Sequence, residues 1–127
     1  MSDGHVRVVL DTGAIKAFTL GSIDVGEVIA EVADEGAAVG LPILCLVEAA
    51  RSVADTDRLD LLASHSAVVV LLPWPTDWRA LAVTCDIVGR LDAASAVLAA
   101  YDLDCSVLTN QPGLYAGLAD GGPIIPF

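Results

Sequence analysis

Short apolar runs alternate along the chain with longer segments whose apolar residues recur at helical spacing. Runs with the length of β-strands lie at residues 6–10, 37–41, 67–72, 105–108 and 123–126. Helical patterns lie at residues 12–18, 22–33, 42–53, 55–64, 76–88 and 91–101, with a short turn or helix at 111–118. This alternation predicts an α/β fold of three layers, α/β/α, with a parallel sheet of about five strands.

Local signals refine the boundaries of these elements. Ser22 is a suitable N-cap for the helix that follows it, and Gly36 and Gly89 are suitable helix ends. The run at 67–72 is rich in β-branched residues without alternation, so we expect both of its faces to be covered. The prolines in 123–126 favour a strand at the edge of the sheet.

The composition indicates one compact unit. A chain of 127 residues is the length of a single domain, here residues 1–127. Hydrophobic residues make up 55% and aromatic residues 5%, so the core must be aliphatic. Apolar stretches stay well short of the roughly 20 residues of a membrane span, and the N-terminus lacks the pattern of a signal peptide. The sequence therefore predicts a cytoplasmic protein with no membrane contact.

The charge limits the possible partners. The net charge is −11, whereas proteins that bind nucleic acids usually carry a basic surface. The six basic residues are scattered, so contact with RNA would need metal ions, a local basic patch or a basic partner chain. The acidic residues between positions 24 and 35 fall mostly on the outer face of one predicted helix, where we expect them to be solvated.

Three acids stand in apolar surroundings far apart in the sequence. Asp11 ends the first apolar run, Glu48 lies within Leu-Cys-Leu-Val-Glu-Ala-Ala, and Asp92 begins an alanine-rich helix. Carboxylates are rarely buried unless they are paired or coordinate a metal, and strand ends are where open α/β proteins place chemistry. The pattern predicts one acidic site for a divalent cation.

Each acid also has a simpler interpretation. Asp11 is a suitable N-cap for the helix at 12–18. Glu48 is spaced for an ion pair with Arg51. We expect Glu48 to be buried, however, and the free energy of such a pair alone is too small to offset the cost of burying the carboxylate. Asp92 is favoured near a helix N-terminus by the helix dipole.

Four segments resemble PIN domains, of the small VapC-like kind found in bacterial toxin–antitoxin pairs. They are Val8-Val9-Leu10-Asp11-Thr12-Gly13-Ala14-Ile15, the segment 41–49 around Glu48, the segment 89–96 around Asp92, and Cys105-Ser106-Val107-Leu108-Thr109-Asn110. The resemblance runs over nearly the whole chain. It implies an endoribonuclease that cleaves single-stranded RNA with a carboxylate-bound Mg²⁺ or Mn²⁺.

The resemblance also assigns roles to particular residues. Asp11 and Asp92 would bind the metal directly or through water, and Glu48 would bind it or orient the attacking water. Supporting side chains would be Thr12, Thr109, Asn110, Gln111 and Arg51. The implied partners are a cognate antitoxin protein and a second copy of the chain in a homodimer.

The last segment departs from the family pattern. The family usually has an aspartate where this chain reads Thr109-Asn110-Gln111, so the site would have three carboxylates instead of four. Two hypotheses therefore remain: an active metal-dependent ribonuclease, or a weak or inactive PIN-like module retained for protein binding.

Overall fold

The computed structural model describes residues 5–127, which contain a five-stranded, entirely parallel sheet in the order β3-β2-β1-β4-β5. The strands are β1 (Val6–Leu10), β2 (Ala38–Pro42), β3 (Val68–Leu71), β4 (Ser106–Thr109) and β5 (Ile124–Pro126). The expected α/β class, with its parallel sheet of about five strands, is confirmed. β5 lies at one edge of the sheet, as its prolines predict.

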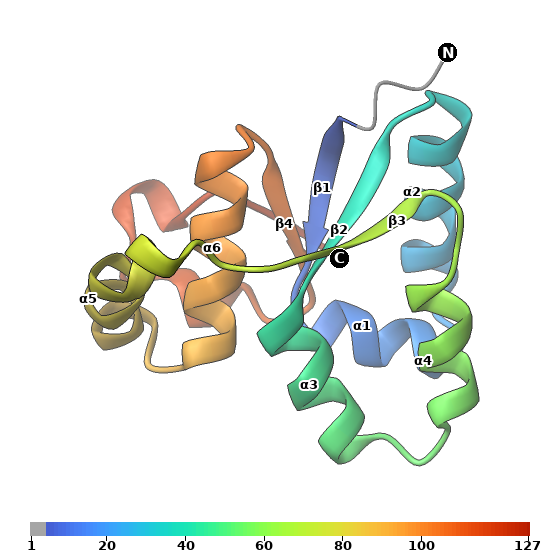
Figure 1. Ribbon diagram of the computed structural model, residues 1–127, viewed down its shortest axis with the longest axis horizontal. Helices are drawn as coiled ribbons and strands as arrows, with labels where there is room; N and C mark the ends of the chain where they lie inside the picture. Colours follow the sequence, from blue (N-terminus) through green and yellow to red (C-terminus); the bar gives the residue numbers. More distant parts are fainter. Residues whose placement is uncertain (1–4) are drawn as a thin grey trace.

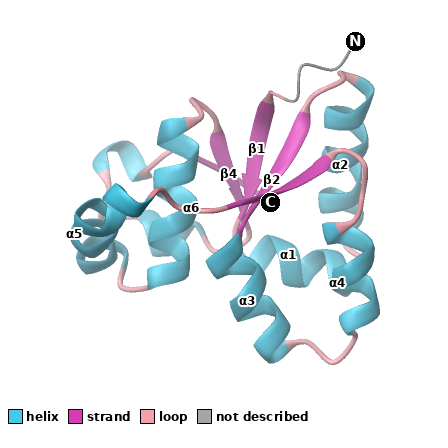
Figure 2. Ribbon diagram, in the orientation of Figure 1, coloured by secondary structure: helices cyan, strands magenta, loops and turns pink. Residues whose placement is uncertain are grey.

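Helices cover both faces of this sheet. The α-helices are α1 (Thr12–Thr19), α2 (Ile23–Asp34), α3 (Ile43–Ser52), α4 (Thr56–Ala63), α5 (Trp78–Val88) and α6 (Leu91–Asp102), and the 3-10 turns are η1 (Pro75–Asp77), η2 (Pro112–Tyr115) and η3 (Ala119–Gly121). The helices α1, α2 and α4 lie on one side of the sheet and α5 and α6 on the other, which gives the three expected layers (Figures 1 and 2). Among the described residues, no helix is both long and apolar enough to cross a membrane.

The helix boundaries follow from local chemistry. The Ser22 hydroxyl accepts a hydrogen bond from the Val25 amide at the start of α2, and the Asp55 carboxylate caps α4. Gly89 ends α5 with a φ of 80°, a left-handed conformation that costs glycine little. These caps explain why most predicted boundaries lie within a residue or two of those observed.

The central strands bury an aliphatic core. β1 lies between β2 and β4, and Leu10 is in register with Leu108 of β4. Val9, Leu10, Leu41 and Val107 are all fully shielded from solvent. Because β1 and β4 are neighbours and parallel, the residues that follow them, near positions 11 and 110, lie at the same end of the sheet.

The expectation that both faces of the run at 67–72 are covered is wrong. β3 is an edge strand, and Val69 and Val70 are 39% and 40% exposed. The helix that follows, α5, packs against α6 and η1 instead of lying over β3. A continuous β-branched run therefore identified a parallel strand here but not its position within the sheet.

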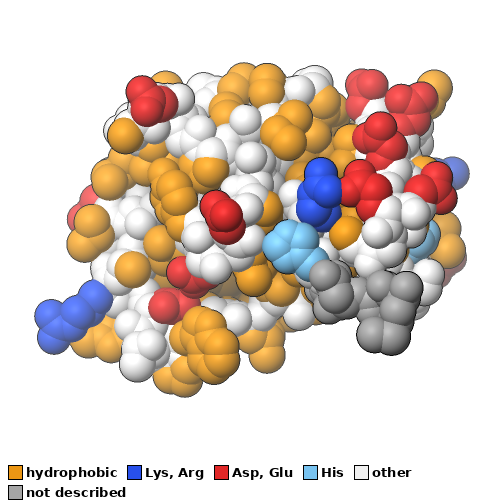
Figure 3. Space-filling view, turned by 90° about the horizontal axis from the view of Figure 1, so that it is seen from above, with side chains coloured by type: hydrophobic (Ala, Val, Ile, Leu, Met, Phe, Trp, Pro, Cys, Tyr) orange, Lys and Arg blue, Asp and Glu red, His pale blue; other side chains and the backbone are white. Residues whose placement is uncertain are grey.

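The surface charge is uneven. The five acidic residues between positions 24 and 35 are all exposed, as predicted. In a view onto one end of the molecule, acidic side chains gather on the side of α2, and apolar side chains dominate the opposite side (Figure 3). The excess of negative charge thus includes a solvated helix face that is separate from the buried acids described below.

Candidate acidic site

Asp11 links the end of β1 to the start of α1. Its carboxylate is only 3% exposed, and one oxygen accepts a hydrogen bond of 3.0 Å from the Ala14 amide, which makes Asp11 the N-cap of α1. The other oxygen accepts a 2.7 Å hydrogen bond from the Tyr115 hydroxyl. The predicted capping role is therefore present, and it uses only part of the hydrogen-bonding capacity of the carboxylate.

Asp92 lies in the first turn of α6 and is 6% exposed. The guanidinium of Arg90 donates to both of its oxygens, from Nε at 3.0 Å and from a terminal nitrogen at 3.1 Å. The Thr12 hydroxyl donates a third hydrogen bond of 2.6 Å. Since Thr12 directly follows Asp11, this bond ties the two buried acids together across 80 residues of sequence.

These contacts determine the ionisation of the site. Burial alone would raise the pKa of Asp92, but the hydrogen bonds from Arg90 and Thr12 outweigh it, and the pKa lies below its usual value. The hydrogen bond to Asp92 likewise raises the pKa of Arg90. Burial, and then the charge of Asp11, raise the pKa of Tyr115. Asp92 is thus an anion at neutral pH, and Tyr115 keeps its proton as a donor to Asp11.

Both acids line one hollow of about 230 Å³ between α1, α6 and the segment after β4. The same hollow is lined by Thr12, Lys16, Arg90, Asn110, Gln111 and Tyr115, among others. Two of the six basic residues of the chain therefore lie beside the two buried acids. A local pair of cations of this kind is one of the ways in which an acidic protein can still contact a polyanion.

Glu48 does not lie in this hollow, and its predicted burial is wrong. Its side chain is 36% exposed and forms an ion pair of 2.7 Å with Arg51, while its neighbour Val47 is 47% exposed. Glu48 lines an adjacent hollow of about 280 Å³, which shares Arg90 and Asp92 with the first. The expected pair with Arg51 is present, and Arg90 and Asp92 line both hollows.

The segment after β4 contributes amides instead of a fourth carboxylate. The Thr109 hydroxyl is buried and accepts a 3.0 Å hydrogen bond from the backbone amide of Gln111. Asn110 reaches over the first turn of α1, so closely that a Cβ at position 13 would collide with its side-chain oxygen. Gly13 thus gives Asn110 room beside Asp11, and the Asn110 and Gln111 amides add polarity without charge.

The residues present fit one divalent cation but not a centre held by three acids. No group of three or more His, Cys, Asp or Glu side chains suited to a metal occurs among residues 5–127. Mg²⁺ needs only one or two carboxylates together with waters and substrate phosphate. The two oxygens of Asp11 each accept one hydrogen bond, which leaves each oxygen further acceptor capacity.

Three residues to which the site gives a role, Lys16, Arg90 and Tyr115, are not foreseen by the sequence analysis. Tyr115 is fully buried and contacts Asp11 from 104 positions away, a relation that no local pattern indicates. Arg90 had one available signal. It occupies the N-cap position of α6, where Ser, Thr, Asp or Asn is preferred and where a cation opposes the helix dipole.

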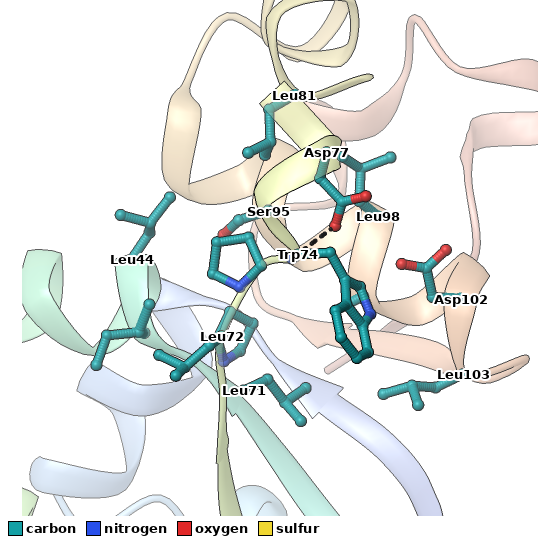
Figure 4. A pocket seen from close by; sticks show the side chains of 14 residues that line it. Leu44, Leu71, Leu72, Trp74, Asp77, Leu81, Ser95, Leu98, Asp102 and Leu103 are labelled. Carbon is teal, nitrogen blue, oxygen red and sulfur yellow. Dashed lines mark hydrogen bonds between the residues drawn. The ribbon is translucent and has the colours of Figure 1, made fainter. Parts of the chain in front are cut away.

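A separate apolar groove of about 240 Å³ lies between α3, the end of β3, η1 and α6. Leu44, Leu71, Leu72, Leu81, Leu98 and Leu103 contribute to its lining (Figure 4). Asp77 accepts a hydrogen bond of 3.0 Å from the Trp74 backbone amide, and Trp74 itself is 70% exposed. This groove contains neither Asp11 nor Asp92, so it offers an apolar contact surface distinct from the acidic hollow.

Comparison with known proteins places the fold but not the function. The chain is similar to the crystal structure of PAE2754 from Pyrobaculum aerophilum, with a TM-score of 0.65 and 18% sequence identity over 96% of this chain and 86% of that one. No known family model and no curated protein matches the chain. At this identity the likeness supports the α/β architecture alone.

Proposed function

We propose that this chain is a metal-dependent endoribonuclease of the PIN type that binds one Mg²⁺ or Mn²⁺ between Asp11 and Asp92. The observation that carries the proposal is the convergence of two buried carboxylates, 3% and 6% exposed, in one hollow that also contains Lys16 and Arg90. The resemblance of four sequence segments to PIN domains supports the same reading. The substrate would be single-stranded RNA.

The residues of the hollow would have different roles. Asp11 and Asp92 would hold the cation, directly or through water, and the Thr12 hydroxyl, next to Asp11 in the chain, holds one oxygen of the Asp92 carboxylate in place. When bound, the cation supplies an acidified water and neutralises charge on the phosphate. Tyr115 holds Asp11 in place, and Lys16 provides positive charge for the RNA backbone. Glu48, which lines the adjacent hollow, would act at most on groups entering from that hollow.

The experiment is cleavage of a mixed single-stranded RNA pool by the purified protein in Mn²⁺, Mg²⁺ or EDTA. Asp11→Asn should lower the metal-dependent rate by more than about 100-fold, because it removes a charged ligand. Asparagine is also a good N-cap, so α1 should survive this change. Asp24→Asn, which neutralises an exposed acid of α2, is the matched control and should leave the rate unchanged.

Absence of cleavage in every metal, from a folded protein, would reject the nuclease. A toxin of this type would also be expected to form a homodimer and to bind a cognate antitoxin. Both partners belong to the proposal and can be tested by light scattering and by co-purification.

The second candidate is a PIN-like module that binds protein instead of cutting RNA. Three observations favour it: Arg90 already neutralises Asp92, Arg51 pairs with Glu48, and Gln111 stands where the family has an acid. The apolar groove beside Leu72 and Trp74 would then be a contact surface.

Gln111→Asp distinguishes the two candidates. In a nuclease the added carboxylate should increase an existing metal-dependent activity. In a binding module the wild-type protein should show no such activity for the substitution to increase.

A further inference from the structure

The position of Arg90 conflicts with the preferences of the helix that it begins. It is the N-cap residue of α6, with an extended backbone (φ −145°, ψ 135°) and no side-chain capping bond. A cation there is disfavoured by the dipole of a 12-residue helix. Residues that break the local preferences of a helix concentrate at functional sites. Here the unfavourable N-cap residue places its guanidinium against Asp92.

Arg90 fills acceptor positions on Asp92 that a metal ion would also need. It donates to both carboxylate oxygens, and Thr12 donates to one of them, so three of about four acceptor positions are filled. A divalent cation beside Asp92 would also be repelled by the guanidinium at short range, in a site with little water to screen the charges.

The two partners differ in their freedom to separate. The Asp92 side chain is 7% exposed, and a buried carboxylate needs a compensating cation. The Arg90 side chain is 46% exposed, so its own charge can be hydrated when it turns away from Asp92. The arrangement therefore allows one cation to replace the other at Asp92 while the carboxylate stays in place.

We propose that Arg90 is a built-in competitor of the metal, which stabilises Asp92 in the metal-free protein and must be displaced when a divalent cation binds. This inference rests on the proposed function, because it assumes that a cation binds between Asp11 and Asp92. It goes further by assigning to Arg90 the control of metal affinity, so that the site is filled only when the cation concentration is high enough to displace the guanidinium.

The test is calorimetric titration of the EDTA-treated, dialysed protein with MnCl₂ alone. Arg90→Ala should bind Mn²⁺ about 10- to 100-fold more tightly than the wild type, the range typical of coupling between two linked sites. Arg90→Lys should lie between them, because a lysine keeps the charge but loses the two-pronged contact. Arg7→Ala is the matched control, since Arg7 also pairs with an acid, Glu35, but at the other end of β1.

Thermal unfolding supplies a second measurement, in which Arg90→Ala should lower the stability of the metal-free protein while it increases the affinity for Mn²⁺. Without metal, Arg90→Ala should have a lower Tm than the wild type because Asp92 loses its counter-charge, and saturating Mn²⁺ should raise its Tm by more than it raises that of the wild type. A purely structural role for Arg90 would lower the Tm without increasing the affinity for Mn²⁺.

The outcomes separate this inference from the proposed function. Tighter Mn²⁺ binding by Arg90→Ala than by a wild type that also binds supports both, and Mn²⁺ binding that only Arg90→Ala shows supports the competitor role but counts against a metal-dependent wild type. Equal or weaker binding by Arg90→Ala than by the wild type overturns the competitor role and leaves the metal site standing. No Mn²⁺ binding by either protein at millimolar concentration overturns the metal site itself and, with it, the role of Arg90.

Discussion

Two carboxylate–arginine pairs lie close together in this protein and differ mainly in their surroundings. Asp92 is 7% exposed in its side chain, pairs with Arg90 through two hydrogen bonds and receives a third from Thr12. Glu48 is 36% exposed and pairs with Arg51, itself 71% exposed, through a single hydrogen bond of 2.7 Å. The same two chemical groups therefore form a buried network in one case and a solvated surface pair in the other.

The surroundings of each pair decide how much its charges contribute to stability. A surface pair of the Glu48 kind is screened by water and typically contributes about 0–1 kcal/mol. Asp92 cannot exchange its partners for water as easily, so each of its hydrogen bonds contributes more to the free energy of unfolding. Spacing in the sequence suggests a pair at Glu48 and Arg51, but only burial shows which of the two pairs is coupled to the rest of the site.

Removing the charge at each acid should expose this contrast most strongly. We expect Asp92→Asn to lower the free energy of unfolding by about 2–3 kcal/mol, because it weakens the charge-assisted hydrogen bonds from Arg90 and Thr12. Glu48→Gln should change it by less than about 0.5 kcal/mol. Urea unfolding at neutral pH measures both, and similar losses for the two variants would contradict the contrast.

The Tyr115 hydroxyl extends the comparison to the other buried acid. Tyr115→Phe should lower the free energy of unfolding by about 1–2 kcal/mol, because one oxygen of Asp11 loses its donor in a buried setting. Tyr101→Phe is the matched control, since Tyr101 is 54% exposed, and it should be nearly neutral. An equal effect of the two changes in urea unfolding would mean that the Asp11–Tyr115 bond contributes no stability.

Lowering the pH should reduce the difference in free energy of unfolding between the wild type and Asp92→Asn. The folded pKa of Asp92 lies below its unfolded value, so its contribution to stability is present above about pH 4 and is lost as the pH falls through the folded pKa. The stability gap between the two proteins should therefore be constant from pH 7 to about pH 5 and shrink below about pH 4. Unfolding curves measured across this range test the sign, and a gap that widens in acid would refute it.

Much of the architecture could be predicted from the sequence. The alternation of apolar runs with helical patterns indicated five parallel strands between helices, and caps such as Ser22 and Gly89 set boundaries that the structure confirms. These signals are local, since they depend on residues a few positions apart, and so they can be recognised without knowledge of the fold. β3 lies at the edge of the sheet with Val69 and Val70 exposed, because the next helix packs elsewhere. The hydrophobic pattern of the strand does not indicate this position.

The candidate site divides in the same way. That Asp11 ends a buried strand and that Asp92 begins a buried helix could be predicted from the chain alone, because both follow from apolar neighbours and capping preferences a few residues away. Three further features follow only from the packing of the elements: the two acids share one hollow, Glu48 lies outside it, and Tyr115 and Arg90 donate hydrogen bonds to the two acids. Hydrogen bonds and screening between charges depend on distances through space, and these distances are fixed only when β1, α6 and the segment after β4 pack together.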